Sequence, residues 1–290
     1  MHLAIGVFDG VHMGHQHLVR ALRERADRAG ATAVAATFDP LPIQFFAPGA
    51  PPSALSDINE RTALLRGAGA GTVVVFLFDD AFSRLSARDF VDRLVRAGDV
   101  KRVMVGEDFR FGHDREGDVR MLRDLAKDRG FDVEIMRPVE RDGAVVSSTR
   151  IRNSLVAGDV AAAERLLGRP YAVPGSIVHG DKRGRALGYP TINVSTPPER
   201  LLPRDGIYAT RVTVGDRTFG AATSLGVRPT FGGGERVLES YLLDFSGDLY
   251  GEEASTSFVA RIRDELRFEN ADALVARISE DVEAVRAALR

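Results

Sequence analysis

Cysteine is absent from the 290 residues of the chain, which excludes disulfide bonds, cysteine nucleophiles and thiolate metal sites. This absence fits an intracellular protein, and we expect a cytoplasmic one. The longest strongly apolar run, VVVFLF at 73–78, falls far short of the roughly 20 residues that a membrane-spanning helix needs. The N-terminus has no basic region and soon reaches Asp9, so no signal peptide is expected.

A surplus of one charge sign is also missing. The formal net charge is −2, so no global positive field favours nucleic acid or an anionic membrane, and we expect neither as a partner. Local basic clusters are present, and they suit small anionic ligands better than a long polyanion. The apolar fraction of 44% is sufficient for ordinary cores, and the length suggests about two domains.

Apolar runs alternate with amphipathic stretches up to about residue 168. Candidate strands cover 2–8, 31–38, 71–78, 100–106 and 131–139. Helical patterns cover 15–30 and lie near 56–68, 86–97 and 116–129. This alternation predicts a doubly wound α/β domain with a parallel sheet, whose ligand site lies at the carboxyl ends of the strands.

The pattern changes in the second half. Short strand candidates separated by turn signals run from 172 to about 262, which is typical of a small antiparallel barrel or sandwich. VGD at 214–216 predicts a hairpin turn, and the last twenty residues predict a C-terminal helix with Asn270 as its N-cap. We place the two domains at 1–168 and 169–290.

The stretch GVFDGVHMGH follows the first predicted strand and opens a helix. His12 and His15, three residues apart, can face the same way on the first turn, and Gly10 and Gly14 allow a ligand to approach the backbone. Free N–H groups favour an anion there, and imidazole donors can stabilise a phosphate under attack. Alternatively, both histidines merely cap or pack.

A second phosphate-type helix start lies at VSSTRIR. Ser147, Ser148 and Thr149 precede a helical stretch that carries Arg150 and Arg152. Hydroxyl and N–H groups at a helix start, together with guanidinium groups, form a polyphosphate cradle. The alternative is an ordinary Ser/Thr cap with solvated arginines.

The densest motif of the second half is GDKRGRALGYPTIN. Its glycine-rich part, Gly180–Gly188 with Lys182 and Arg183, predicts a basic loop over phosphates. Thr191 and Asn193 occupy alternate positions of a strand, so they share one face and can meet one Mg²⁺ through oxygen donors. A solvated loop beside a strand edge is the other interpretation.

Glu239 lies in the apolar and aromatic segment VLESYLLDF. A carboxylate there can accept the proton of an attacking hydroxyl during phosphoryl transfer. A strand glutamate that faces solvent is the simpler interpretation.

Taken in order and spacing, GVFDGVHMGH, VGEDFRFG and VSSTRIR resemble the nucleotidyltransferase half of the bacterial bifunctional riboflavin kinase/FAD synthetases. The resemblance implies a Rossmann-like domain in which FMN attacks the α-phosphate of ATP. It implies His12 and His15 as catalytic residues and GEDFRFG as a lining on the flavin side. The nucleotide- and flavin-binding residues it implies are Gly6, Phe8, Gly10, Gly14, Asp108, Ser147, Ser148, Thr149 and Arg152.

The segments GDKRGRALGYPTIN, GIYA, GVRPTF and ESYLLDF resemble the riboflavin kinase half of the same family. This implies a six-stranded antiparallel barrel, Glu239 as the base, and Thr191 and Asn193 as ligands of Mg²⁺–ATP. The implied phosphate-binding residues of the loop are Gly180, Lys182, Arg183, Gly184 and Gly188. Riboflavin, FMN and ATP are the implied small-molecule substrates.

The chain departs from the family pattern at Leu41, where a histidine is usual after the D-P of the second strand. A monofunctional riboflavin kinase with a weak adenylyltransferase domain is therefore the alternative function. A flavin-binding sensor is a further alternative. Glu239, Thr191 and Asn193 argue against it, because a sensor needs neither a base nor a metal site. A nucleotidyltransferase acting on a non-flavin alcohol would leave the barrel motifs unused.

Overall fold

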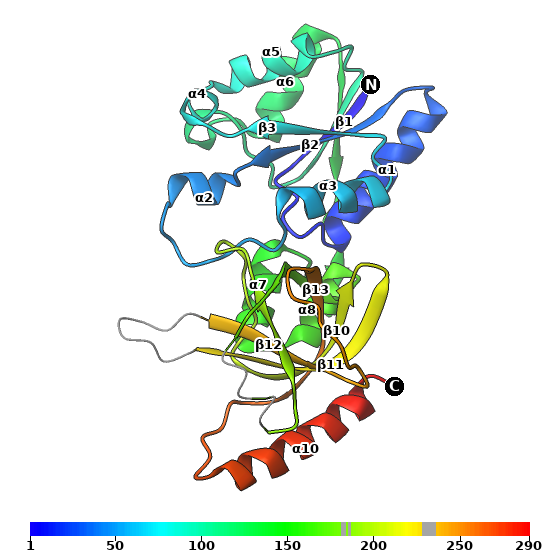
Figure 1. The fold of residues 1–290 in the computed structure, drawn as a ribbon. Helices are drawn as coiled ribbons and strands as arrows, with labels where there is room; N and C mark the ends of the chain where they lie inside the picture. The colour runs from blue at the N-terminus through cyan, green and yellow to red at the C-terminus, as the bar shows by residue number, and fades with distance from the viewer. Residues whose placement is uncertain (181–183, 185–186, 228–235) are drawn as a thin grey trace. The chain divides into compact units, whose positions relative to one another are not determined.

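The computed structural model describes residues 1–180, 184, 187–227 and 236–290, and the chain forms two compact units, Met1–Ser148 and Thr149–Arg290 (Figure 1). Two helices follow the β-strands of the first unit, α7 (Ser148–Ala157) and α8 (Val160–Leu167). Helix α8 contacts the strands of the second unit. The division of the two activities between residues 168 and 169 stays a prediction.

A parallel sheet forms the first unit, with the strand order β3-β2-β1-β4-β5. Its strands are β1 (His2–Ile5), β2 (Ala33–Asp39), β3 (Thr72–Leu77), β4 (Arg102–Gly106) and β5 (Asp132–Met136). A small hairpin, β6 (Glu140–Arg141) with β7 (Ala144–Val145), follows. All five strands expected from the apolar runs are confirmed.

Helices cover both faces of this sheet. They are α1 (Met13–Arg28), α2 (Pro42–Phe46), α3 (Ile58–Gly67), α4 (Asp80–Ser83), α5 (Ala87–Arg96), the 3₁₀ turn η1 (His113–Arg115) and α6 (Val119–Arg129). Leu22 of α1 and Leu65 of α3 share one core with Met104 of β4, whereas Phe90 and Leu122 share the opposite core. The doubly wound α/β domain is thereby confirmed.

The second unit contains a closed barrel of six antiparallel strands in the order β10-β11-β12-β9-β8-β13. They are β8 (Tyr171–Val178), β9 (Thr191–Ser195), β10 (Gly206–Val214), β11 (Arg217–Val227), β12 (Arg236–Leu242) and β13 (Glu253–Arg263). Val214 pairs with Arg217 across the predicted hairpin turn, where Gly215 has a φ of 56°. The barrel implied by the family resemblance is confirmed.

Hydroxyl groups run through the interior of the barrel. Thr210, Thr223 and Ser240 are fully buried on three neighbouring strands. Their oxygens lie 2.6 Å apart between the two threonines and 2.8 Å apart between Thr223 and Ser240. Side chains on the alternate positions of β12, including Glu239, therefore point to the outside of the barrel.

The C-terminal helix α10 (Ala271–Ala288) covers part of the outer face. The side chain of Asn270 accepts the N–H of Ala273 at 2.8 Å, so the predicted N-cap is confirmed. Arg263 of β13 and the buried Asp281 of α10 form a double hydrogen bond, at 2.8 and 2.5 Å. This ion pair fixes the helix to the barrel.

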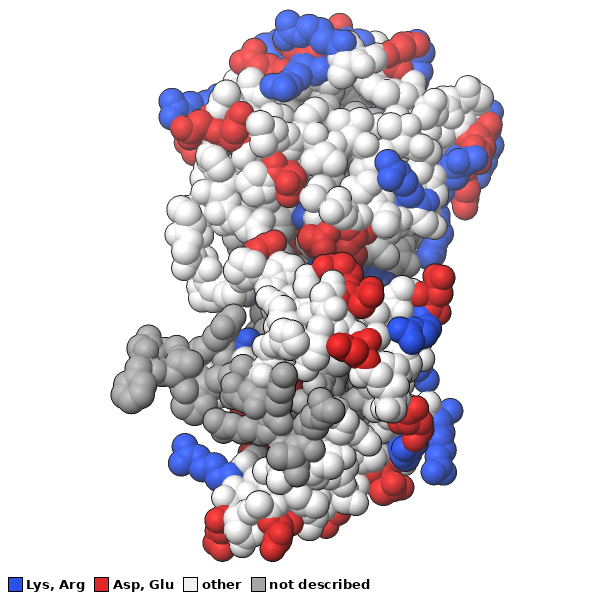
Figure 2. All heavy atoms as spheres, in the orientation of Figure 1, with Lys and Arg blue, Asp and Glu red and all other residues white. Residues whose placement is uncertain are grey.

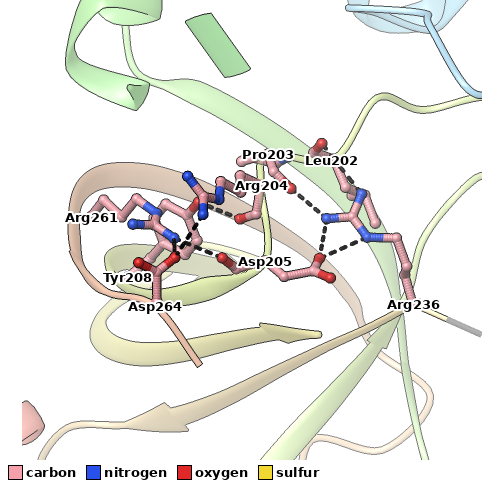
Figure 3. A network of polar contacts seen from close by, with 8 residues as sticks. All are labelled: Leu202, Pro203, Arg204, Asp205, Tyr208, Arg236, Arg261 and Asp264. Carbon is pink, nitrogen blue, oxygen red and sulfur yellow. Dashed lines mark hydrogen bonds and ion pairs between the residues drawn. The ribbon is translucent and has the colours of Figure 1, made fainter. Parts of the chain in front are cut away.

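A network of polar contacts links β10, β12 and β13 through the segment that precedes β10 (Figure 3). Arg236 binds the carboxylate of Asp205 through Nε at 2.9 Å and also binds the carbonyl of Pro203. Arg261 donates to the carbonyl of Asp205 at 2.8 Å and to Asp264 at 2.6 Å. The start of β12 is thereby held in place, three positions before Glu239.

On the face drawn in Figure 2, basic and acidic residues are interspersed, and no continuous basic surface is seen there. None of the helices in the described ranges is both long enough and apolar enough to cross a membrane.

Candidate active sites

The turn between β1 and α1 has an unusual backbone. Phe8, Gly10 and Val11 have φ values of 52°, 76° and 39°. A positive φ is easy for glycine and strained for a β-branched residue such as valine. Strain of this kind persists only where the surroundings hold it, and it gathers at functional sites.

Buried hydrogen bonds supply that support. The carboxylate of Asp9, with 1% of its surface exposed, accepts the N–H of Leu55 at 3.0 Å and of Ser56 at 3.1 Å. Ser56 Oγ in turn accepts the N–H of Gly10 at 2.9 Å. The segment before α3 and the turn after β1 are thus bonded to each other at the carboxyl end of the sheet.

The two histidines of this turn lie face to face. His12 is the N-cap of α1, and its Nδ1 accepts the N–H of His15 at 3.4 Å. The two rings stack with centroids 3.6 Å apart, and the ring of Phe8 meets His15 edge-on at 5.1 Å. A Cβ on Gly14 would lie 3.2 Å from the ring of His12, so glycine leaves room for the stack.

The electrostatics of the pair define its hydrogen-bonding capacity. Burial, then the neighbouring His12 and Arg61, hold the pKa of His15 well below its usual value, so its imidazole is neutral at neutral pH. His15 Nδ1 has no partner among the described residues. A neutral imidazole whose Nδ1 accepts a hydrogen bond carries its proton on Nε2.

The VSSTRIR motif reaches the same turn through one serine. Ser148 Oγ donates to the carbonyl of Asp9 at 3.0 Å, although the two residues are 139 positions apart in the chain. Ser147 directly precedes Ser148, whereas Thr149 and Arg152 lie further along α7, within the second unit. The structure therefore brings Ser148 to the histidine turn.

Two other predicted residues lie at the carboxyl ends of β1 and β4. A Cβ on Gly6 would lie 3.0 Å from the ring of Phe8, so the strand end accommodates that ring. Asp108 is exposed just after β4, the neighbour of β1, and its Oδ1 lies 3.1 Å from the position of a Cβ on Gly106.

Leu41, which replaces the usual histidine, is fully buried at the N-cap of α2. Its backbone N–H donates to Gln44 Oε1 at 3.0 Å. The side chain at this position therefore packs in the core and offers no group to a phosphate.

Sequence reasoning missed the buried polar residues beneath the histidine turn, namely Asp9, Ser56 and Arg61. Asp9 is part of the recognised motif but was not assigned a role. Arg61 lies four residues before the buried Leu65 on α3, so both side chains face the core. An arginine at a core-facing helical position is the signal that could have identified it.

In the second unit, three predicted residues meet on the outer face of the barrel. Asn193 of β9 pairs with Glu239 of β12, and Thr191 pairs with Tyr241, two positions along. Thr191 Oγ1 donates to Glu239 Oε1 at 2.5 Å, and Asn193 is only 6% exposed. A hydroxyl, an amide and a carboxylate thus form one cluster.

Two glycines of the loop 180–188, Gly180 and Gly184, lie close to this cluster. A Cβ on Gly180 would lie 2.2 Å from Asn193 Nδ2, and one on Gly184 would lie 2.4 Å from the carbonyl of Tyr189. Gly188 has a φ of 85°, which favours glycine. Lys182 and Arg183 lie outside the described residues.

The donor set suits magnesium. Mg²⁺ prefers one or two protein oxygens and takes the rest from phosphate and water. Thr191, Asn193 and Glu239 offer oxygens of that kind. Among the described residues, no group of three or more His, Asp or Glu side chains could hold a metal ion.

Comparison with known proteins gives one consistent result. Residues 1–150 match the family model of FAD synthetase, and residues 167–289 match that of riboflavin kinase. The bifunctional riboflavin kinase/FMN adenylyltransferase of Pseudomonas fluorescens is 42% identical, over 98% of this chain and 91% of its own length. The protein of the same name from Escherichia coli K12 is 38% identical, over 96% of this chain and 90% of its own.

A solved structure shares the whole fold. The crystal structure described as a macrolide-efflux protein from Streptococcus pneumoniae superposes with a TM-score of 0.90 at 33% sequence identity. The match covers 98% of this chain and 93% of that one.

Proposed function

The chain belongs to the family of bifunctional riboflavin kinase/FMN adenylyltransferases, and on that premise we propose which of its residues carry out the two reactions. The enzyme phosphorylates riboflavin with ATP, giving FMN and ADP. It then adenylylates FMN with ATP, giving FAD and pyrophosphate. The residue assignments below are proposals supported by the geometry of the two units.

Glu239 is the proposed base of the kinase reaction. Its carboxylate accepts the proton of the 5′-hydroxyl of riboflavin as that oxygen attacks the γ-phosphorus of ATP and ADP leaves. The hydrogen bond from Thr191 orients this carboxylate. The meeting of Glu239, Thr191 and Asn193 on one face is the observation that carries the kinase assignment.

Thr191 and Asn193 are the proposed protein ligands of Mg²⁺, which would be held mainly through the phosphates of ATP. The ion, when bound, neutralises charge that develops on the phosphates. The loop 180–188 is the proposed phosphate cover, with N–H donors from Gly180, Gly184 and Gly188 and charge from Lys182 and Arg183. The close approach of Gly180 to Asn193 supports this, since the backbone there reaches the metal-binding face directly.

His12 and His15 are proposed to serve the adenylyltransferase reaction. An oxygen of the FMN phosphate attacks the α-phosphorus of ATP, and pyrophosphate leaves. Donors at the start of α1, including Nε2–H of His12, stabilise the charge that builds up on the α-phosphate. The stacked ring pair at the N-cap of α1 supports this role.

Other residues of the first half are proposed to bind substrates. Gly6, Phe8, Gly10 and Gly14 shape the turn for a close approach of the nucleotide. Ser147, Ser148, Thr149 and Arg152 are proposed ATP ligands, and Asp108 a residue on the flavin side. A cytoplasmic location, and small molecules rather than nucleic acid or membrane as partners, complete the proposal.

The test is a chromatographic time course with riboflavin, ATP and Mg²⁺ that resolves riboflavin, FMN and FAD. FMN should appear first and FAD second, and FMN supplied directly should give FAD. FMN that accumulates without FAD would contradict the assignment of the first site and support the kinase alternative suggested by Leu41. No product at all would contradict both assignments.

A further inference from the structure

Arg61 is the largest fully buried side chain among the described residues, with 1% of its surface exposed. Its Nη1 donates to the carbonyl of Phe38 at 2.8 Å and to Thr37 Oγ1 at 3.3 Å, and Nη2 donates to the carbonyl of Ser56 at 3.4 Å. All three acceptors are neutral oxygens. The guanidinium group therefore joins the end of β2 to the segment before α3.

Two of its three partners, Thr37 and Ser56, are also hydrogen-bonded to the histidine turn. Thr37 Oγ1 also donates to the carbonyl of Val7 at 2.9 Å. Ser56 accepts the N–H of Gly10 and donates its own N–H to Asp9. Val7 and Asp9 flank the strained Phe8. Each is therefore linked to Arg61 through one intermediate residue, Thr37 for Val7 and Ser56 for Asp9.

Within the described ranges of the chain, Arg61 makes no direct ion pair, and carboxylates act on it from a distance. Burial lowers its pKa, and the nearby charges of Asp9, Asp39, Asp57 and Glu60 raise the pKa again. Its Nε has no partner among the described residues. A buried cation with neutral acceptors costs stability that an aliphatic side chain would not cost.

That cost suggests a role other than stability. The positive charge lies beneath the carboxyl ends of β1 and β2, where the phosphates of ATP are proposed to bind. It also acts on His15, whose pKa it lowers together with burial and His12. A fixed charge in a dry site attracts an anion more strongly than one in water.

We propose that Arg61 is a positioning residue for FMN adenylylation: it holds the histidine turn in shape and places a positive charge behind the phosphate site. This inference rests on the proposed roles of His12 and His15. Arg61 acts through these residues and through Asp9 and Ser56.

The test uses the full-length enzyme, whose kinase reaction serves as an internal control for folding of the second unit. Arg61→Met should lower kcat for FMN adenylylation by about 100-fold, since small displacements of catalytic groups have effects of that size. It should raise KM for ATP and leave FMN formation unchanged. Because removal of the charge raises the pKa of His15, the acid limb of the kcat/KM profile should move to higher pH.

Two further variants separate positioning from mere stability. Arg61→Lys retains the charge but not the forked hydrogen bonds, so the acid limb should return to its wild-type position while kcat recovers only in part. Arg129→Met removes another arginine of the first unit. Arg129 lies on α6 and pairs with Asp92 of α5 at 2.5 Å. The substitution should lower the melting temperature without moving the acid limb.

Wild-type kcat and an unmoved acid limb in Arg61→Met would overturn the inference, as would equal effects in Arg129→Met. If Arg61→Met does not fold, wild-type kcat in Arg61→Lys would overturn the positioning role. His15→Ala tests the underlying assignment separately. Full adenylylation by that variant would contradict the proposed role of His15, whatever Arg61 does.

Discussion

Thr191 and Glu239 lie on the neighbouring strands β9 and β12, and the threonine hydroxyl donates a hydrogen bond to the glutamate carboxylate. The ladder places Asn193 directly opposite Glu239. The proposed base is therefore oriented by one of the proposed metal ligands. The groups proposed to bind the metal and to accept the proton of the attacking hydroxyl lie on the same face of two paired strands. Strands hold such groups more precisely than loops do.

Glu239→Gln should abolish most riboflavin phosphorylation while FAD formation from supplied FMN continues. The amide retains the shape but cannot accept the proton, and loss of a general base costs about 10²- to 10⁴-fold. Initial rates of both reactions measure the effect. Glu253→Gln is the matched control, because Glu253 is an exposed strand glutamate whose carboxylate accepts a hydrogen bond from Ser176 Oγ at 2.5 Å. Equal losses in the two variants would rule out a specific role for Glu239.

His15→Ala should stop the overall reaction at FMN. The substitution removes the ring that stacks on His12 and lies edge-on to Phe8, so the donors at the start of α1 lose their arrangement. We expect FAD formation to fall by about 100-fold or more, with riboflavin phosphorylation intact. His17→Ala, an exposed histidine on the same helix, is the control and should leave both rates unchanged. Undiminished FAD from His15→Ala would remove the histidine from the mechanism.

The fold, and the clustering of some candidate site residues, could be predicted because they leave local signals. The β-branched runs gave all five parallel strands, and the alternation of Thr191 and Asn193 correctly placed both on one face. The polar support beneath the histidine turn could not be predicted in this way. Asp9, Ser56 and Arg61 meet only because β1, β2 and α3 are brought together by the fold.

At Leu41, too, the sequence alone does not reveal the surroundings of the side chain. The sequence marks it as a departure from the family pattern, but only the structure shows that this position is fully buried. The leucine therefore packs in the core, where it supplies no polar group to a ligand.

Gly180→Ala should impair the kinase reaction more than it impairs folding. The new methyl group would lie 2.2 Å from Asn193 Nδ2, so either the loop or the proposed magnesium ligand must move. We expect KM for ATP to rise and kcat to fall, with FAD formation from FMN unchanged. Titration of the rate with Mg²⁺ measures the effect directly, because a displaced Asn193 raises the Mg²⁺ concentration needed for half-maximal rate. An unchanged Mg²⁺ dependence would contradict the prediction that the new methyl group displaces a magnesium ligand.

Asp281→Asn should destabilise the second unit. Asp281 is 4% exposed and binds Arg263 through both oxygens, so the substitution removes the carboxylate partner of a largely buried guanidinium group. Breaking one partner of a buried pair costs about 3–5 kcal/mol. Chemical denaturation followed by riboflavin kinase activity measures the cost. Glu280→Gln, one residue away in an exposed pair with Arg277, should cost less than about 1 kcal/mol. Similar midpoints for both variants would contradict a structural role for the buried pair.

His2 should make the first unit less stable in acid. It is 5% exposed on β1, and burial, followed by the charge of Arg102, lowers its pKa from 6.5. Below that value the unfolded chain binds a proton that the folded chain resists, so stability falls as the pH drops below about 6.5 and levels off below the folded pKa. His15 acts in the same direction, since its pKa is also lowered. Calorimetric melting between pH 8 and 5 should therefore show a smaller slope for His2→Leu than for the wild type, whereas the exposed His17→Leu should retain the full slope. Coincident slopes for His2→Leu and the wild type would assign the acid sensitivity to other groups, with His15 the next to replace.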